Sequence, residues 1–298
     1  MRRHHLVSIA ALSLTVALTG CSADSDTDST GQDSATQTLG HVHGLATDPG
    51  TDTLLVATHE GLYELTSTGK LDKVGPVIDL MGFAVAGPDH YFASGHPGPG
   101  VDMPQPVGLI ESTDGGRTWT PLSRQGQSDF HALTVSQAGV VGYDGSLVTT
   151  ADQQTWETLP IPAAPASIAA SDHGQQLLAT TEQGLLRSAD AGQSWDPVPD
   201  APLLQVVDWS TGLATVGISP AGDVWTSDDG GLTWRAGAEL GAAPQAVDLT
   251  VNGDQVTITA MVGNQLVGLL MAGRRSPASP SPNSRQVAVI VSASPRRW

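Results

Sequence analysis

Hydrophobic residues between positions 38 and 272 occur in short runs rather than at helical spacing. The runs consist mainly of Val, Leu, Ile, Ala and Thr, and they are interrupted by Gly, Pro and Asp. Short apolar runs bounded by turn residues are typical of β-strands. We therefore expect residues 38–272 to form an all-β domain.

The same turn sequence recurs between these runs. The pattern Ser-x-Asp-x-Gly-x-x-Trp occupies residues 112–119, 188–195 and 227–234, and a fourth copy is one residue short and lacks the glycine. The aspartates and tryptophans of the four copies are Asp114, Trp119, Asp152, Trp156, Asp190, Trp195, Asp229 and Trp234. Successive tryptophans are 37, 39 and 39 residues apart. Such a period indicates repeated units that pack on their neighbours.

This turn sequence resembles the BNR or Asp-box repeat of sialidases, sortilin-type receptors, photosystem assembly propellers and several secreted glycoside hydrolases. The resemblance implies a β-propeller. In each box we expect the Asp to accept backbone N–H bonds, the Gly to adopt a positive φ, and the Trp to pack between neighbouring sheets. The box is expected to be structural, because one Asp per turn supplies too few oxygen ligands for calcium.

The units can be aligned on these turns to predict the number of blades. Their first strands are expected to begin near His43, Met81, His131, Ala166, Gln205 and Gln245. Six units of four strands predict a six-bladed propeller, with seven blades as the alternative. The last unit supplies three strands, near residues 246–251, 255–261 and 265–271. Its fourth strand comes either from residues 286–292 or from residues 36–40, unless residues 273–298 form an out-of-frame or disordered tail.

The first 37 residues predict export and anchoring. Arg2 and Arg3 precede an uncharged apolar stretch from Leu6 to Leu18, which is too short to span a bilayer and is typical of a signal peptide over residues 1–20. The next residues, Leu-Thr-Gly-Cys21, resemble the lipobox of bacterial lipoproteins, which implies cleavage before Cys21 and lipidation of its sulfur. The polar residues that follow predict a flexible tether over 21–37. We therefore expect a lipid anchor in the cell membrane, with the domain on the outer face.

Charge narrows the range of partners. Residues 22–272 contain all 30 acids of the chain but only six Lys and Arg residues, a net charge of −24. Such a surface repels nucleic acid and attracts cations. Apart from the membrane, we expect an unknown protein or glycan partner and a monomeric chain. Because Cys21 is the only cysteine, packing alone must hold the fold together.

The repeat alignment predicts that five histidines share one face of the propeller. His41, His43 and His131 lie where first strands begin, as does Met81, and His59 and His96 fall between second and third strands. Imidazole and thioether ligands suit copper, and several imidazoles suit copper or zinc. We expect a copper or zinc site at the channel mouth, with Asp129 orienting an imidazole. The plainer alternative is that each histidine forms ordinary hydrogen bonds and that Met81 fills the core.

A long Pro-rich and Gly-rich loop at residues 96–106 is expected on the same face. Because binding residues concentrate on loops held by a rigid scaffold, this loop would form a rim that brings Asp102 and Met103 near the site. Alternatively, it is a surface excursion without a role in binding.

A glycoside hydrolase and a scaffold protein are the two alternatives to metal binding. Sialidases hold their substrate with three arginines, but Arg117, Arg187 and Arg235 adjoin the turn repeats on the opposite face, which leaves only Arg124. A glycoside hydrolase that uses a carboxylate pair is the stronger enzymatic alternative, with Glu60, Asp129, Asp144 and Glu182 as candidates. The remaining hypothesis is an assembly or receptor scaffold that binds no small ligand. The sequence favours binding over catalysis.

Overall fold

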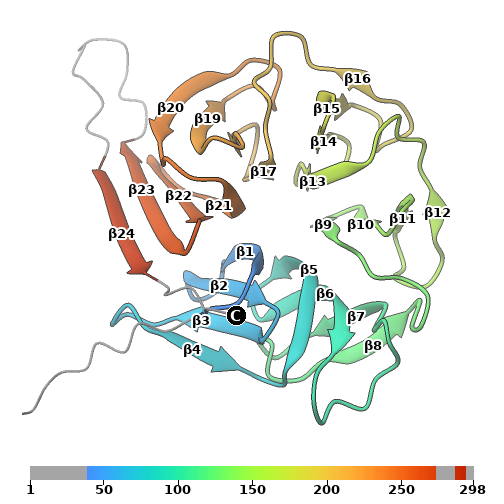
Figure 1. Ribbon diagram of the computed structural model, residues 1–298. Coiled ribbons are helices and arrows are strands. Elements are labelled where there is room, and N and C mark those ends of the chain that lie inside the picture. The colour runs from blue at the N-terminus through green and yellow to red at the C-terminus, as the bar shows by residue number, and fades with distance from the viewer. Residues whose placement is uncertain (1–38, 273–285, 293–298) are drawn as a thin grey trace, which may run out of the picture. The chain divides into compact units, whose positions relative to one another are not determined.

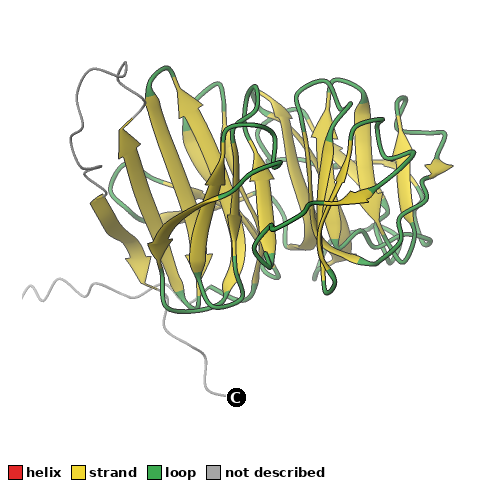
Figure 2. Ribbon diagram, turned by 90° about the horizontal axis from the view of Figure 1, so that it is seen from above, coloured by secondary structure: helices red, strands yellow, loops and turns green. Residues whose placement is uncertain are grey.

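Strands and turns make up the part of the chain that the computed structural model describes, residues 39–272 and 286–292. Twenty-four strands form six antiparallel four-stranded sheets in these residues. The sheets are arranged as blades around a common centre (Figure 1), and a view turned by 90° shows their strands running alongside one another (Figure 2). The domain is a six-bladed β-propeller, as predicted, and the seven-bladed alternative is wrong.

Each blade uses four consecutive strands, beginning with the strand that lines the channel. Blades one and two comprise β1 (Val42–Asp48), β2 (Thr53–Thr58), β3 (Gly61–Leu65), β4 (Leu71–Val74), β5 (Ile78–Gly87), β6 (His90–Pro97), β7 (Leu109–Ser112) and β8 (Thr120–Ser123). Blades three and four comprise β9 (Ala132–Ser136), β10 (Gly139–Tyr143), β11 (Leu147–Thr150), β12 (Glu157–Thr158), β13 (Pro165–Ala170), β14 (Leu177–Thr181), β15 (Gly184–Ser188) and β16 (Asp196–Pro197). Blades five and six comprise β17 (Val206–Trp209), β18 (Thr215–Ile218), β19 (Asp223–Ser227), β20 (Arg235–Glu239), β21 (Pro244–Asn252), β22 (Gln255–Val262), β23 (Gln265–Ala272) and β24 (Gln286–Ser292).

Burial changes across each blade. All five residues of β14 and all four of β18 are buried, because these second strands have a neighbouring blade on both faces. Both residues of β12 and both of β16 are exposed at the outer edge. Strands buried on both faces are expected to be apolar without alternation, which matches the runs in the sequence. The apolar core therefore lies between blades, as six clusters, rather than at one centre.

In blades two to five, the repeated turn between the third and fourth strands packs the blade against the one before it. In blade five, Asp229 accepts hydrogen bonds from the backbone N–H of Thr233 (2.9 Å) and from its hydroxyl (2.5 Å). Gly231 has a φ of +81°, and a Cβ atom there would lie 2.8 Å from Leu178 in blade four. Trp234 donates its indole N–H to the Gly231 carbonyl at 3.0 Å. The turn therefore needs a glycine both for its backbone conformation and for its close approach to the preceding blade.

The other copies of the turn vary on this arrangement. Asp114 and Asp190 accept the same pair of bonds from the residue four positions later. In the short copy, Asp152 still accepts backbone N–H bonds, but Trp156 donates to the hydroxyl of Ser123 at 3.0 Å. All four tryptophans pack against the apolar clusters between blades. The hydrogen bonds and packing expected of these residues are therefore present.

The last blade is completed from the C-terminal side. β24 pairs antiparallel with β23, for example through Leu269 and Val287. This is one of the three arrangements that the sequence left open, and it adds a strand to the domain expected to end at residue 272. Residues 273–285 and 293–298 lie outside the described residues, as do the predicted signal peptide, Cys21 and the tether. No helix in the described part of the chain is long and apolar enough to cross a membrane.

Candidate metal centre and central channel

Three histidines of blade one meet at the mouth of the channel. His41 precedes β1, His43 lies within it, and His59 lies in the turn between β2 and β3. One ligating atom from each ring can be chosen so that all three atoms lie within 4.8 Å of one another. The backbone N–H of His59 donates to the carbonyl of His41 at 3.3 Å, which holds the turn against the start of β1. Local strand pairing thus produces the cluster, and it places His43 on the channel wall.

Asp79 of blade two joins this group. Its Oδ1 atom lies 2.8 Å from Nδ1 of His59 and 3.9 Å from Nε2 of His43. Asp79 is not among the residues predicted from the sequence, although the unit alignment contains a signal for it. When His43 is aligned with Met81 and His131, the residues two positions earlier are His41, Asp79 and Asp129. A side chain that could ligate a metal ion therefore stands at this position in each of the first three blades.

The environment keeps two of these imidazoles uncharged. Burial, and next the neighbouring imidazole of His59, lowers the pKa of His43 to about 3. The same causes lower the pKa of His41. The side chain of His43 is only 12% exposed, so burial is a sufficient reason for its large shift. A neutral imidazole is the form that binds a metal ion, and His41 and His43 are neutral at neutral pH.

The remaining two predicted histidines form a separate group around Asp129. The Oδ2 atom of Asp129 lies 3.1 Å from Nε2 of His96 and 3.6 Å from Nε2 of His131. Two buried atoms of this group, Nδ1 of His96 and Oδ1 of Asp129, have no hydrogen-bond partner among the residues that the structure describes. His131 also lines the channel with His43. The five histidines are therefore divided between two groups, and Asp129 contacts imidazoles as expected.

The other predicted candidates are not part of the three-histidine cluster. Met81 is half-buried in β5 and is not among the residues that line the channel. Met103 packs against the core between blades one and two, whereas Asp102 is exposed. The loop that contains them therefore contributes a core contact through Met103.

The four candidate catalytic acids lie in different surroundings. Glu60 accepts a hydrogen bond from the backbone N–H of Gly40 at 3.1 Å, beside the histidine cluster. Asp144 forms an ion pair with Arg124 at 3.1 Å. Glu182 is exposed in the turn between β14 and β15, and Asp129 contacts the two histidines. No hydrogen bond joins two of these acids in the described residues.

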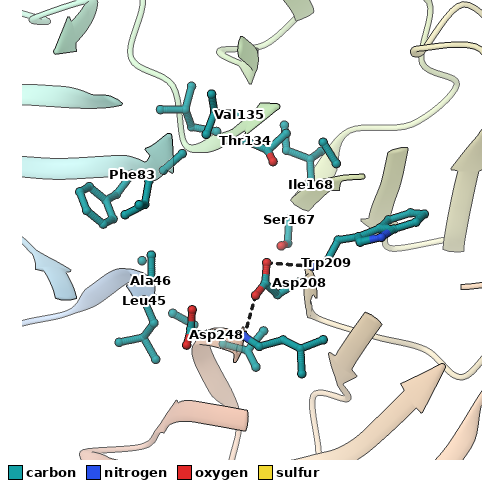
Figure 3. A pocket seen from close by; sticks show the side chains of 18 of the residues that line it. Leu45, Ala46, Phe83, Thr134, Val135, Ser167, Ile168, Asp208, Trp209 and Asp248 are labelled. Atoms are coloured by element: carbon teal, nitrogen blue, oxygen red, sulfur yellow. Dashed lines mark hydrogen bonds between the residues drawn. The ribbon is translucent and has the colours of Figure 1, made fainter. Parts of the chain in front are cut away.

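A channel of about 700 Å³ runs between the first strands of all six blades. Asp208 of β17 and Asp248 of β21 extend into it from adjacent blades (Figure 3). Asp208 accepts the backbone N–H of Leu249 at 2.7 Å, and Asp248 accepts that of Thr47 at 3.0 Å. Burial raises the pKa of both carboxyl groups, and the charge of Asp248 raises that of Asp208 further. This pair is not among the residues predicted from the sequence, although both acids occupy the fourth position of the aligned segments 205–209 and 245–249.

No protein-family model and no curated protein sequence matches the chain. Among solved structures, it is similar to an ancestral GH74 enzyme, with a TM-score of 0.58 and 12% identity over 84% of this chain and 39% of that one. A GH74 xyloglucanase from Xanthomonas campestris gives 0.52 and 16%, over 80% and 45%. YCF48 from Cyanidioschyzon merolae gives 0.51 and 12%, over 78% and 95%. The chain spans less than half the length of the two GH74 proteins, and at these identities the likeness shows a β-propeller fold alone.

Proposed function

We propose that this protein is a lipid-anchored, extracytoplasmic Asp-box propeller that binds one Cu²⁺ or Zn²⁺ ion through His41, His43 and His59. The observation that carries the proposal is the meeting of these three imidazoles, with ligating atoms within 4.8 Å of one another. The hydrogen bonds of the repeated turns support membership of the Asp-box group. The lipobox-like residues before Cys21 support the anchor.

The cluster needs little rearrangement to hold a metal ion. Nitrogen ligands about 2.0–2.1 Å from a tetrahedral Zn²⁺ ion lie roughly 3.3 Å apart. Nε2 of His43 and Nδ1 of His59 are already 3.4 Å apart. His41 and His59 are exposed, so there is room for their rings to adjust toward a common centre. The half-buried His43 would then provide the fixed ligand.

Neighbouring charge favours a cation at this place. Oδ1 of Asp79 lies 2.8 Å from the same Nδ1 atom of His59, so its carboxylate would stand beside a bound ion and contribute negative charge. Glu60 accepts a hydrogen bond from the backbone N–H of Gly40, the residue before His41, and so lies beside that histidine. The acidic chain would also raise the local concentration of cations.

Metal analysis of the full chain, purified in detergent, tests the proposal. After loading with Cu²⁺ or Zn²⁺ and removal of free metal, we expect about one bound ion per chain. His43→Ala and His59→Ala should lose this ion, and Asp79→Asn should weaken its binding, because the substitution removes a negative charge beside the ion. His173→Ala is the matched control, because His173 bonds to Gln137 at the far ends of the inner strands. Unchanged metal content in His43→Ala would refute the assignment.

The same experiment separates this site from the second histidine group. His96→Ala and His131→Ala should retain the ion if His41, His43 and His59 are the ligands. Loss of metal only in these two variants would instead assign it to the group around Asp129. A glycoside panel assayed on the metal-free chain tests the alternative hydrolase function, and hydrolysis abolished by Glu60→Gln would support that alternative.

A further inference from the structure

The central channel has the size and enclosure of a ligand site. Small-molecule pockets typically have volumes of about 300–1,000 Å³, and the channel has about 700 Å³. First strands from all six blades form its wall, so the wall is held by the whole propeller. His43 lies near the end where these strands begin, and Asp172 lies beyond the end of β13.

The polar residues of the channel wall have a marked charge bias. Asp172, Asp208 and Asp248 line the channel, and no Lys or Arg is among its lining residues in the described part of the chain. Asp248 is only 6% exposed. Two carboxyl groups held close together at low exposure are unfavourable when ionised unless a positive charge compensates them.

The backbone of neighbouring blades holds the two central carboxyl groups in place. Asp208 accepts N–H bonds from Trp209 (2.8 Å) and from Leu249 (2.7 Å), one at each oxygen. Asp248 accepts the N–H of Thr47 at Oδ1 and the hydroxyls of Thr47 and Thr250 at Oδ2, so its Oδ1 atom retains an acceptor position. A carboxylate oxygen has two lone pairs, so each oxygen of Asp208 retains an acceptor position after its backbone bond. The pair is thus oriented in advance for a further donor.

Apolar residues form part of the remaining wall. Ala46 and Val135 lie at the opening beside the carboxyl pair (Figure 3), whereas Phe83 and Ile168 belong mainly to the buried clusters between blades. A hard metal ion such as Ca²⁺ needs six to eight oxygen ligands, which a wall of this composition does not supply. A ligand that has one positive group and a short apolar body matches both parts of the wall.

We propose that the central channel binds a small organic cation, a primary ammonium with a short apolar chain, whose charged group lies between Asp208 and Asp248. The ammonium group would donate hydrogen bonds to both carboxylates and compensate their charge. Its chain would lie along Ala46 and Val135. This site is distinct from the metal centre and does not require it.

Calorimetric titration of the metal-free full chain with n-butylammonium tests the proposal, with n-butanol as the neutral probe of matched shape. We expect saturable binding of one n-butylammonium per chain at roughly millimolar affinity and no comparable binding of n-butanol. Asp208→Asn should weaken binding at least tenfold. Asp172→Asn should change it less than twofold, because Asp172 lies away from the pair.

A second variant keeps the test decisive if Asp208→Asn does not fold. Ala46→Phe leaves the charge unchanged but places a larger side chain on the channel wall, and it should also weaken n-butylammonium binding at least tenfold. Equal affinity in wild type and Ala46→Phe would show that the cation binds elsewhere on the acidic surface. That result, equal binding of n-butanol, or no saturable binding in the wild type would each overturn the proposal.

Discussion

The aspartates of this propeller occupy two opposite environments. Hydrogen bonds from the hydroxyl and the backbone N–H of Thr118 lower the pKa of Asp114, at the exposed turn, to about 2. Burial instead raises the pKa of Asp208 and Asp248 in the channel. The turn aspartate stays ionised and organises its turn, whereas the channel aspartates gain or lose a proton at a higher pH. One residue type therefore has a structural role at the rim of the blades and a candidate binding role at their centre.

The exposed turns provide the first prediction. Asp229→Ala removes the acceptor of the bonds from Thr233 and Leu232, and those backbone N–H groups then bond to water instead. Because the turn is partly exposed, we expect a loss of about 1 kcal/mol in the free energy of unfolding. Urea denaturation measures this value. Asp102→Ala, at an exposed loop position, should stay within about 0.5 kcal/mol of wild type, and an equal effect of the two substitutions would contradict the assigned role.

The buried carboxyl pair provides a second prediction, about pH. Burial, followed by the charge of Asp248, raises the pKa of Asp208 to about 7, above the value of about 3.9 in an unfolded chain. The folded state then holds the proton more tightly, so this contribution to stability is complete below about pH 4 and is lost as pH rises through about 7. Unfolding free energy should therefore fall from about pH 5 to about pH 8 more steeply in wild type than in Asp208→Asn.

The comparison with Asp208→Asn isolates this contribution. His43, His131 and Asp172 line the same channel and are present in both proteins, so the difference between the two profiles reports the carboxyl pair. Asp208 keeps some exposure to the channel, and the effect should be smaller than full burial would give. Parallel pH profiles for the two proteins would show that the pair carries no bound proton.

At the level of elements, hydrophobic pattern predicted the inner strands better than the outer ones. Residues 246–251 were expected as a first strand, and β21 extends over Pro244–Asn252. The two-residue strands β12 and β16 are exposed and have no apolar pattern that a sequence could reveal. The position of β24 was left among three alternatives, because residues 273–285 separate it from β23 and pairing across such a segment depends on tertiary structure.

Truncation tests the importance of β24. A chain that ends at residue 272 leaves β23 as an edge strand with unpaired backbone groups, which favours association with other chains. We expect poor solubility and a Tm lower by at least roughly 5 °C in thermal unfolding. A chain that ends at residue 292 keeps the strand and should behave like the full chain. Equal Tm values for the two truncated chains would mean that β24 adds no stability.

At the scale of the whole molecule, the sequence predicted that five histidines share one rim of the propeller. It did not predict that they form two separate groups. Repeat alignment fixes the strand on which a residue stands and the end of that strand. Distances between blades depend on how the sheets pack, which separates His96 and His131 from the cluster of His41, His43 and His59. The channel carboxyl pair was missed for the same reason, since its members are 40 residues apart and meet only when adjacent blades pack.

Membrane anchoring is a property of the whole molecule that depends on Cys21. Cleavage before Cys21 and addition of a diacylglycerol would attach the chain by two acyl chains, enough for stable membrane binding. Cys21→Ser removes the sulfur that would carry the lipid, so the chain should move from the membrane fraction to the soluble extracytoplasmic fraction. Mass spectrometry of the N-terminal peptide should find the lipid in wild type and in the control Ser22→Ala. An anionic membrane surface repels the strongly acidic domain, so only a lipid would hold it there. If the wild-type protein is already soluble, the anchor assignment is wrong.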